Sequence, residues 1–226
     1  MKSFLSIFLI LFTSTVFTQN ISYDDFMRET KFNKRLLPKQ GSTTKSVDQL
    51  AAEKAYVEKM KEEYNSSREA SNVLIQEGIE NLKVDPREAM YSFNNAYLVD
   101  SSNAMVYWGY GKLYSYFKQF DLAEDYFQEG LYRNGKETHL LNSLAMNYQH
   151  KYAEEELNEY LEQAIGLLDE SLKANDKEPY AYLLMTQVYL KLGNCGIAKD
   201  YFKDYSALAG EQSNPELKQS IENNCN

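Results

Sequence analysis

The sequence has few of the residues that break helices. Among its 226 residues are only 4 prolines and 10 glycines. After residue 46 it also lacks the alternation of polar and apolar residues that is typical of half-buried strands. It is rich in tyrosine, with 19 residues, and such rings suit packed helices that bury the ring and leave the hydroxyl near water. The composition therefore predicts an all-α chain.

The sequence also has fewer positively charged than negatively charged residues. Lys and Arg number 24 against 33 Asp and Glu, which gives a formal net charge of −9, and no basic stripe interrupts this acidity. An acidic surface repels the phosphate backbone of nucleic acids and the headgroups of anionic membranes. We therefore expect no nucleic-acid partner.

The sequence has one long apolar run, from Phe4 to Phe12, which is interrupted only by Ser6. It follows Lys2, precedes small residues, and is shorter than the roughly 20 residues of a membrane span. These features are typical of a signal peptide, so we predict one over residues 1–19 and an exported, periplasmic or secreted protein without stable membrane insertion. The alternative is an uncleaved anchor. Residues 20–46 show no strong period and are predicted to be extended or mobile.

A repeat occupies the remaining domain, residues 47–226. Its unit is large-x-x-large-small-x-x-Tyr on one helix and Ala-x-x-x-large on the next. The interval is 34 residues from Tyr107 to Leu141, but 41 from Ala123 to Ala164. The seven extra residues lie within 149–163 and predict a longer hairpin with Glu154 to Glu156 near its tip. We expect helices over 48–64, 66–82, 86–99, 103–117, 120–133, 137–152, 156–174, 178–191, 195–209 and 214–224.

Small residues at fixed positions let paired helices approach closely, while large neighbours fill the remaining volume. Those small residues are Gly111, Ala123, Ala145, Ala164 and Ala198. A single pair cannot cover its own apolar face, so pairs stack. The predicted fold is an α-solenoid of three to four antiparallel helix pairs with a C-terminal capping helix.

This pattern resembles the tetratricopeptide-repeat family over about residues 67–208. The match is carried by Tyr107, Tyr110-Gly111, Tyr114, Ala123 and Phe127, and by Tyr182, Tyr189, Ala198 and Phe202. The chain departs from the family in its missing helix-stopping prolines, its degenerate first repeat and its stretched third repeat. The closing segment also looks like small exported repeat proteins of Bacteroidetes-type bacteria. The resemblance implies a superhelical scaffold that binds proteins.

The two cysteines are predicted to form a disulfide. Cys195 begins the second helix of the last repeat, and the capping helix returns antiparallel to end beside Cys225. Export would place both where disulfides persist. The alternative is a reactive thiol, although no His or Lys pair is placed to lower its pKa.

The sequence contains no enzyme motif, neither a phosphate loop nor His-Glu-x-x-His nor a nucleophile elbow. His139 and His150 share a helix face, but the ligands of a metal site are missing, and we read them as surface residues. We therefore expect no enzyme, no cofactor and no metal.

Binding is expected on the concave side of the solenoid, where each first helix presents a second stripe of side chains. Trp108, the sole tryptophan, is its best candidate hot spot. We call the following set the concave stripe: Met105, Trp108, Lys112, Ser115, His139, Asn142, Met146, Gln149, Tyr180, Leu183, Gln187 and Leu190. The residues predict an adaptor for a protein or peptide, and the alternatives are a structural subunit of an envelope assembly or an enzyme. A further possibility is that Tyr23 to Leu37 covers the stripe. The partner and the oligomeric state stay open.

Overall fold

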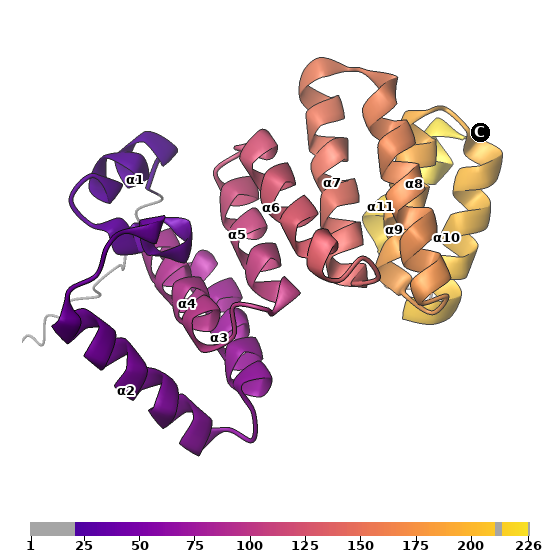
Figure 1. Ribbon diagram of the computed structural model, residues 1–226. Coiled ribbons are helices and arrows are strands. Elements are labelled where there is room, and N and C mark those ends of the chain that lie inside the picture. Colours follow the sequence, from indigo (N-terminus) through magenta and orange to yellow (C-terminus); the bar gives the residue numbers. More distant parts are fainter. Residues whose placement is uncertain (1–20, 211–213, 226) are drawn as a thin grey trace, which may run out of the picture.

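The computed structural model describes residues 21–210 and 214–225, and these ranges contain helices and no strand (Figure 1). The predicted signal peptide lies outside the described residues. The α-helices are α1 (Tyr23–Thr30), α2 (Val47–Glu63), α3 (Ser67–Leu82), α4 (Pro86–Val99), α5 (Ala104–Tyr116), α6 (Phe120–Arg133), α7 (Thr138–Glu155), α8 (Asn158–Ala174), α9 (Pro179–Lys191), α10 (Cys195–Ala209) and α11 (Pro215–Asn224). Two 3-10 segments, η1 (Lys34–Leu36) and η2 (Pro38–Ser42), precede α2. The ten predicted helices are confirmed, with ends shifted by three residues or fewer.

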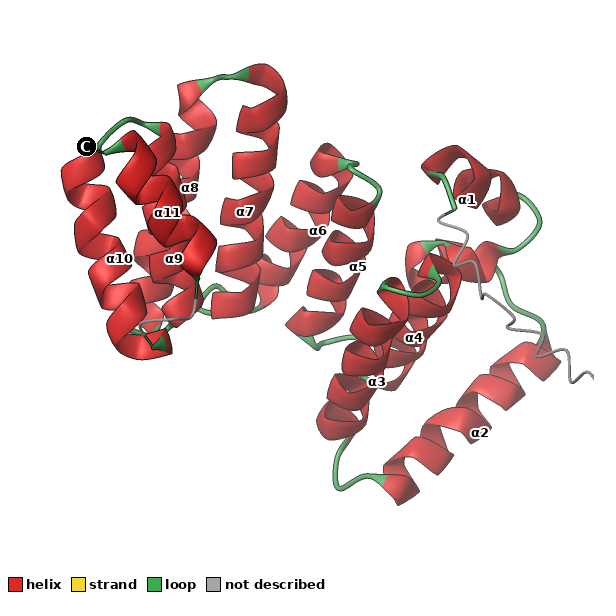
Figure 2. Ribbon diagram, turned by 180° about the vertical axis from the view of Figure 1, so that it is seen from behind, coloured by secondary structure: helices red, strands yellow, loops and turns green. Residues whose placement is uncertain are grey.

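Four antiparallel hairpins stack along one axis: α3/α4, α5/α6, α7/α8 and α9/α10 (Figure 1). The first helices α3, α5, α7 and α9 contact one another in sequence and form the inner layer. The second helices α4, α6, α8 and α10 form the outer layer. Seen from behind, α11 lies against the last hairpin, where it contacts α9 and α10 (Figure 2). The predicted α-solenoid is therefore confirmed.

Helix starts follow from local capping. Pro86, Pro179 and Pro215 occupy first-turn positions, where a missing N–H costs nothing. The side chains of Asp85 and Asn214, which precede two of these prolines, accept hydrogen bonds from backbone N–H groups of the first turn. Local sequence thus places the start of each of these helices.

The core depends on glycines that face phenylalanines. A Cβ on Gly111 would lie 2.3 Å from the ring of Phe127, and one on Gly78 would lie 2.3 Å from the ring of Phe93. Phe93 also touches Gly109 of the next hairpin. Both rings are fully buried. Gly78 sits one position late in the repeat pattern but still provides the close approach, which is why the degenerate first repeat packs as the others do.

The hairpin α7/α8 is longer than its neighbours, as predicted. Its helices have 18 and 17 residues, whereas those of α5/α6 have 13 and 14. Glu156 caps α7 in a left-handed conformation with a φ of 58°, so the turn at the tip begins at the predicted acidic run. The hairpin extends beyond the adjacent ones in Figure 1.

The prediction of an extended or mobile segment before residue 47 is wrong for most of the described part. Ser22 caps α1, whose first turn contains Asp24 and Asp25, and this capping signal is present in the sequence. Phe26 and Leu36 are fully buried. The segment folds because its few apolar side chains find a partner surface, a long-range effect that no local periodicity reveals.

We call residues 31–43 the strap. It crosses the outer helix α4 and reaches α6, held by buried Asn94. The Nδ2 of Asn94 donates to the backbone oxygens of Arg35 and Leu37, at 2.7 and 2.9 Å. The strap residue Lys39 forms an ion pair with Glu129 of α6 at 3.1 Å. The strap therefore lies on the outer layer and contacts α4, α5 and α6 through residues outside the concave stripe.

The predicted disulfide is confirmed. Cys195 and Cys225 are bonded with their Cα atoms 5.4 Å apart. It closes the capping helix onto the start of α10. Lys199 adds a hydrogen bond from Nζ to the backbone oxygen of Cys225 at 2.9 Å.

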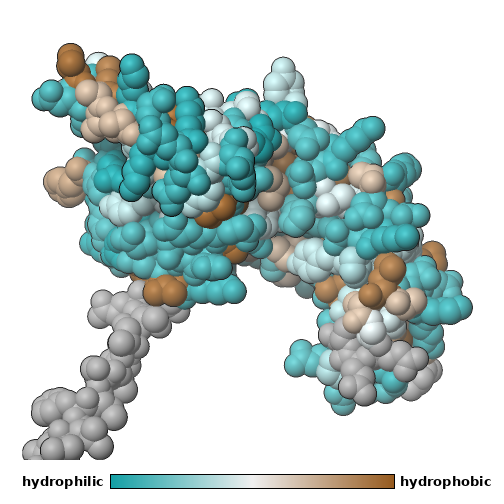
Figure 3. All heavy atoms as spheres, turned by 90° about the horizontal axis from the view of Figure 1, so that it is seen from below, coloured by the Kyte–Doolittle hydropathy of each residue, from teal (hydrophilic) through white to brown (hydrophobic). Residues whose placement is uncertain are grey.

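The face seen in Figure 3 is mainly hydrophilic, with scattered hydrophobic residues. Among the described residues, no helix combines the length and apolarity that a membrane span requires. The exposed apolar side chains include Phe32, Val47 and Tyr132. Single exposed residues of this kind are normal on protein surfaces and need no partner.

Candidate partner-binding surfaces

The structure brings the concave stripe together from three consecutive inner helices. Trp108 of α5 donates from Nε1 to the Oγ of Ser143 on α7 at 2.8 Å. Its ring meets that of His139 edge to face, with centroids 5.8 Å apart. Tyr180 of α9 donates to the sulfur of Met146 at 3.1 Å. Neighbouring inner helices are thus linked through stripe residues.

Trp108 is half-buried and packs against both halves of the core. Its N–H is already bonded to Ser143, so the ring offers a partner mainly its apolar surface. Met105, Ser115, Leu183, Gln187 and Leu190 are also half-buried, whereas His139 and Tyr180 are exposed. The exposure of the stripe residues thus ranges from buried to exposed, and that of Trp108 is intermediate.

Polar groups of the stripe are incompletely satisfied. Asn142 and Gln149 are 3% and 4% exposed, yet Asn142 Oδ1 and Gln149 Nε2 have no hydrogen-bond partner among the described residues. The Oε1 of Gln149 accepts a bond from Lys191 Nζ at 3.2 Å. Sequence reasoning missed Lys191 and Ser143. Lys191 lies four residues after Gln187 on the same helix, so its place beside the stripe was readable, whereas Ser143 is revealed only by the packing of α5 on α7.

Two lysines of the inner face, Lys112 and Lys191, form no ion pair with a carboxylate among the described residues. Burial lowers the pKa of Lys112 and of Lys191. His150 stacks on Phe120 with ring centroids 5.2 Å apart. Its pKa is lowered by burial and by the nearby charges of Lys191 and Lys112. Around His150 the lysines, which also include Lys118, therefore outweigh the opposing charge of Glu154, although the chain as a whole is acidic.

His139, at the other end, differs from His150 in its partner. Its Nδ1 lies 3.3 Å from Glu137 Oε1, and this hydrogen bond raises the pKa of His139. The structure thus gives the two histidines separate environments. Within the described ranges, no cluster of His, Cys, Asp and Glu is arranged to hold a metal ion.

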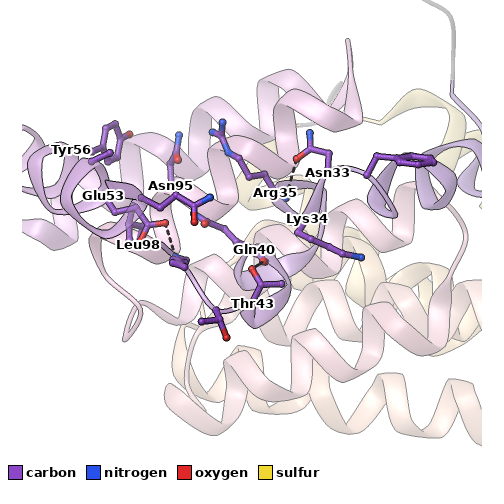
Figure 4. Close-up of a pocket in the computed structure, with 14 residues that line it drawn as sticks. Asn33, Lys34, Arg35, Gln40, Thr43, Glu53, Tyr56, Asn95 and Leu98 are labelled. Carbon is purple, nitrogen blue, oxygen red and sulfur yellow. Dashed lines mark hydrogen bonds and ion pairs between the residues drawn. The ribbon is translucent and has the colours of Figure 1, made fainter. Parts of the chain in front are cut away.

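A separate hollow of about 630 Å³ lies between α2, the strap and α4 (Figure 4). It exists because α2 buries only Met60, so most of the helix stands away from its neighbours. Lys45 at its rim is paired with Glu53 at 2.6 Å, and Arg35 lies over the ring of Tyr91, 4.9 Å from its centroid. These two cations are engaged within the chain, which makes this hollow a weaker candidate than the stripe.

Comparison with known proteins supports the class of the fold. No family model matches the chain. No curated protein matches it either. Among solved structures, it is similar to TTC0263, a thermophilic TPR protein in Thermus thermophilus, with 18% identity and a TM-score of 0.58 over 68% of this chain and 80% of that one. A second is PilW, a type IV pilus biogenesis factor, with 18% identity over 68% and 86% of the chains and a TM-score of 0.32.

The likeness to TTC0263 shows the fold alone, because the identity is low, and the likeness to PilW carries no argument. The chain is an all-α solenoid of the tetratricopeptide-repeat type. Its function has to be argued from its own surfaces.

Proposed function

We propose that the chain is an exported adaptor that binds an extended protein or peptide segment along the concave stripe, without catalysis. One observation carries this proposal: the stripe places the half-buried ring of Trp108 beside the exposed His139 and near Lys112, which has no ion pair among the described residues. Asn142 Oδ1 and Gln149 Nε2 also lack partners among these residues, but each atom has less than 1 Å² exposed, so a ligand reaches them only after their side chains turn outward. The accessible ring and the lysine are therefore the groups that carry the binding.

The chemistry of the stripe defines its ligand. Trp108 offers a large rigid surface, and Met146 and Leu183 add apolar area that adapts to a bound side chain. Lys112 and Lys191 favour hydrogen-bond acceptors or carboxylates over cations. The expected ligand is therefore a segment with an apolar anchor flanked by acceptor groups.

The disulfide supports export, because such bonds persist in the periplasm and outside the cell but not in a reducing cytosol. This agrees with the predicted signal peptide. Cleavage at Thr18 or Gln19 would be seen as the N-terminal residue of the protein recovered from cells.

The test replaces Trp108 and Lys112 together with alanine. The control replaces Tyr132 and Lys136, an aromatic and a lysine with the same spacing on the exposed surface; Tyr132 is 92% exposed. Crosslinking in intact cells followed by mass spectrometry identifies partners of the unchanged chain. We expect the stripe variant to lose them and the control to keep them.

Loss of folding is checked by circular dichroism, and Lys112→Glu serves as a milder variant because it retains Trp108. Partners that persist in both stripe variants, with the fold intact, would refute binding at the stripe. A permanent role in an envelope assembly is the alternative. It predicts a stable large complex in native extract, whereas an adaptor with transient partners elutes largely as the free chain.

A further inference from the structure

The outer layer contains a groove that the chain fills itself. Between α4 and α6, the strap buries Leu36 and donates its Lys39 N–H to the hydroxyl of Tyr110 at 3.1 Å. The Nζ of Lys39 pairs with Glu129 at 3.1 Å. An aliphatic side chain and a lysine three residues later thus secure a segment of two consecutive 3-10 turns in this groove.

The equivalent groove one repeat further, between α6 and α8, is not filled. Its hollow has a volume of about 470 Å³. Five residues that line it occupy the repeat positions of Asn94, Tyr110, Tyr114, Tyr126 and Glu129. In the same order they are Gln128, Leu144, Tyr148, Leu167 and Glu170.

Two substitutions within the repeat explain the hollow. In the first groove Tyr126 stacks on Tyr114 with centroids 5.3 Å apart, and in the last repeat Tyr201 stacks on Tyr189 at 5.6 Å. Helix α8 has Leu167 at this position, and the ring that stacks on Tyr148, with centroids 6.1 Å apart, is that of Tyr160, which does not line the hollow. The preceding residue, Gly166, has no side chain, and a Cβ there would meet nothing within 4 Å.

The walls of this groove combine apolar and acidic groups. Leu131, Leu144 and Leu167 supply the apolar part. Glu170 forms no ion pair among the described residues, although Glu129 at the equivalent position binds both Lys39 and Arg133. The groove therefore lacks a cation where its filled counterpart has one.

We propose that the α6–α8 groove is a second docking site, which takes a turn-forming segment of another protein that, like the strap, bears an aliphatic residue and, three residues later, a lysine. The lysine pairs with Glu170 as Lys39 pairs with Glu129, and the aliphatic side chain covers the leucines. The site lies on the outer layer, so its existence does not depend on the concave stripe.

The test selects displayed random peptides on the purified protein and titrates the recovered peptides in solution. Leu167→Tyr closes the groove with the ring that both neighbouring repeats carry, and Gly166→Gln fills it from a position with free space. Glu170→Lys reverses its charge. Leu208→Tyr, at a position 42% exposed on α10, is the matched control.

We expect the recovered peptides to contain the aliphatic residue and the lysine. Their affinity for each of the three groove variants should be at least tenfold lower than for the unchanged chain. Their affinity for the control should differ from it by less than twofold. Peptides without a cation, peptides that bind Leu167→Tyr as well as the unchanged chain, or no recovered peptide would overturn the proposal. So would light scattering that shows a dimer dissociated by Leu167→Tyr, because the occupant would then be a second copy of this chain.

Discussion

A single methyl group is predicted to have opposite effects at two helical glycines, Gly78 and Gly166. At Gly78 the new Cβ would lie 2.3 Å from Cε1 of Phe93. That ring is fully buried, and its same edge already touches Gly109, so it has little room to retreat. Overpacking of this kind costs about 1–3 kcal/mol. Alanine also recovers about 1 kcal/mol of helix propensity. The net destabilisation of Gly78→Ala is about 0–2 kcal/mol.

At Gly166 alanine brings the gain in helix propensity without the overpacking cost. No atom lies within 4 Å of the new methyl group, so Gly166→Ala should stabilise α8 by up to about 1 kcal/mol. The two variants have the same change in composition and both lie within helices. The propensity gain is common to both, so the difference between them, about 1–3 kcal/mol, measures the close approach of Phe93 alone.

Urea unfolding monitored by far-ultraviolet circular dichroism and by Trp108 fluorescence measures this difference. Stacked repeats can unfold in parts, so agreement of the two probes is required before free energies are compared. Amide exchange should show the loss in Gly78→Ala concentrated in α3 and α4. Phe93→Leu in the Gly78→Ala background should recover part of the stability. Equal shifts in the two alanine variants, or a more stable Gly78→Ala, would refute the packing argument.

The remaining predictions concern the two ends of the chain. Asn94→Asp places an acceptor opposite the carbonyls of Arg35 and Leu37, which should cost about 1–3 kcal/mol and raise amide exchange in the strap, whereas unchanged exchange would contradict its role. The hydrogen bond from Arg87 lowers the pKa of Glu29 in the folded protein. This contact therefore stabilises α1 above the ordinary carboxyl pKa, and the contribution is lost as the pH falls through the lowered value. Exchange in α1, corrected for its intrinsic pH dependence, should rise on acidification, and Arg87→Gln should remove that rise. Replacing Cys195 and Cys225 with serine opens a link between residues 30 positions apart and should cost about 3–4 kcal/mol. Exchange should increase mainly in α10 and α11, and a uniform increase along the solenoid would contradict the nearest-neighbour view.

Much of the architecture could be predicted because the repeat encodes it locally. The spacing of Tyr107, Gly111 and Tyr114 defines a helix face, and the return of that spacing after 34 residues defines the stack. The disulfide followed from the same reasoning, since helix lengths and one reversal bring Cys195 and Cys225 together. The stripe residues were placed on the inner face for the same reason, although binding there is a proposal.

The repeat period did not predict the contacts between distant segments. Phe26 and Leu36 belong to no repeat, and their burial depends on a surface formed by α4, α5 and α6. Ser143 was overlooked because its hydrogen bond to Trp108 joins two repeats. The hydrogen bond from Lys191 to Gln149 likewise joins two repeats, α9 and α7.

The sequence by itself determined the helices, their pairing and the order of the stack, because side-chain size at fixed intervals decides which helix faces can approach. Only the tertiary structure decided which grooves are occupied. The strap fills the groove between α4 and α6 because Asn94, Tyr110 and Glu129 satisfy its backbone and its lysine. The concave stripe and the α6–α8 groove stay uncovered by the strap, since a strap of this length is already held on the first two hairpins.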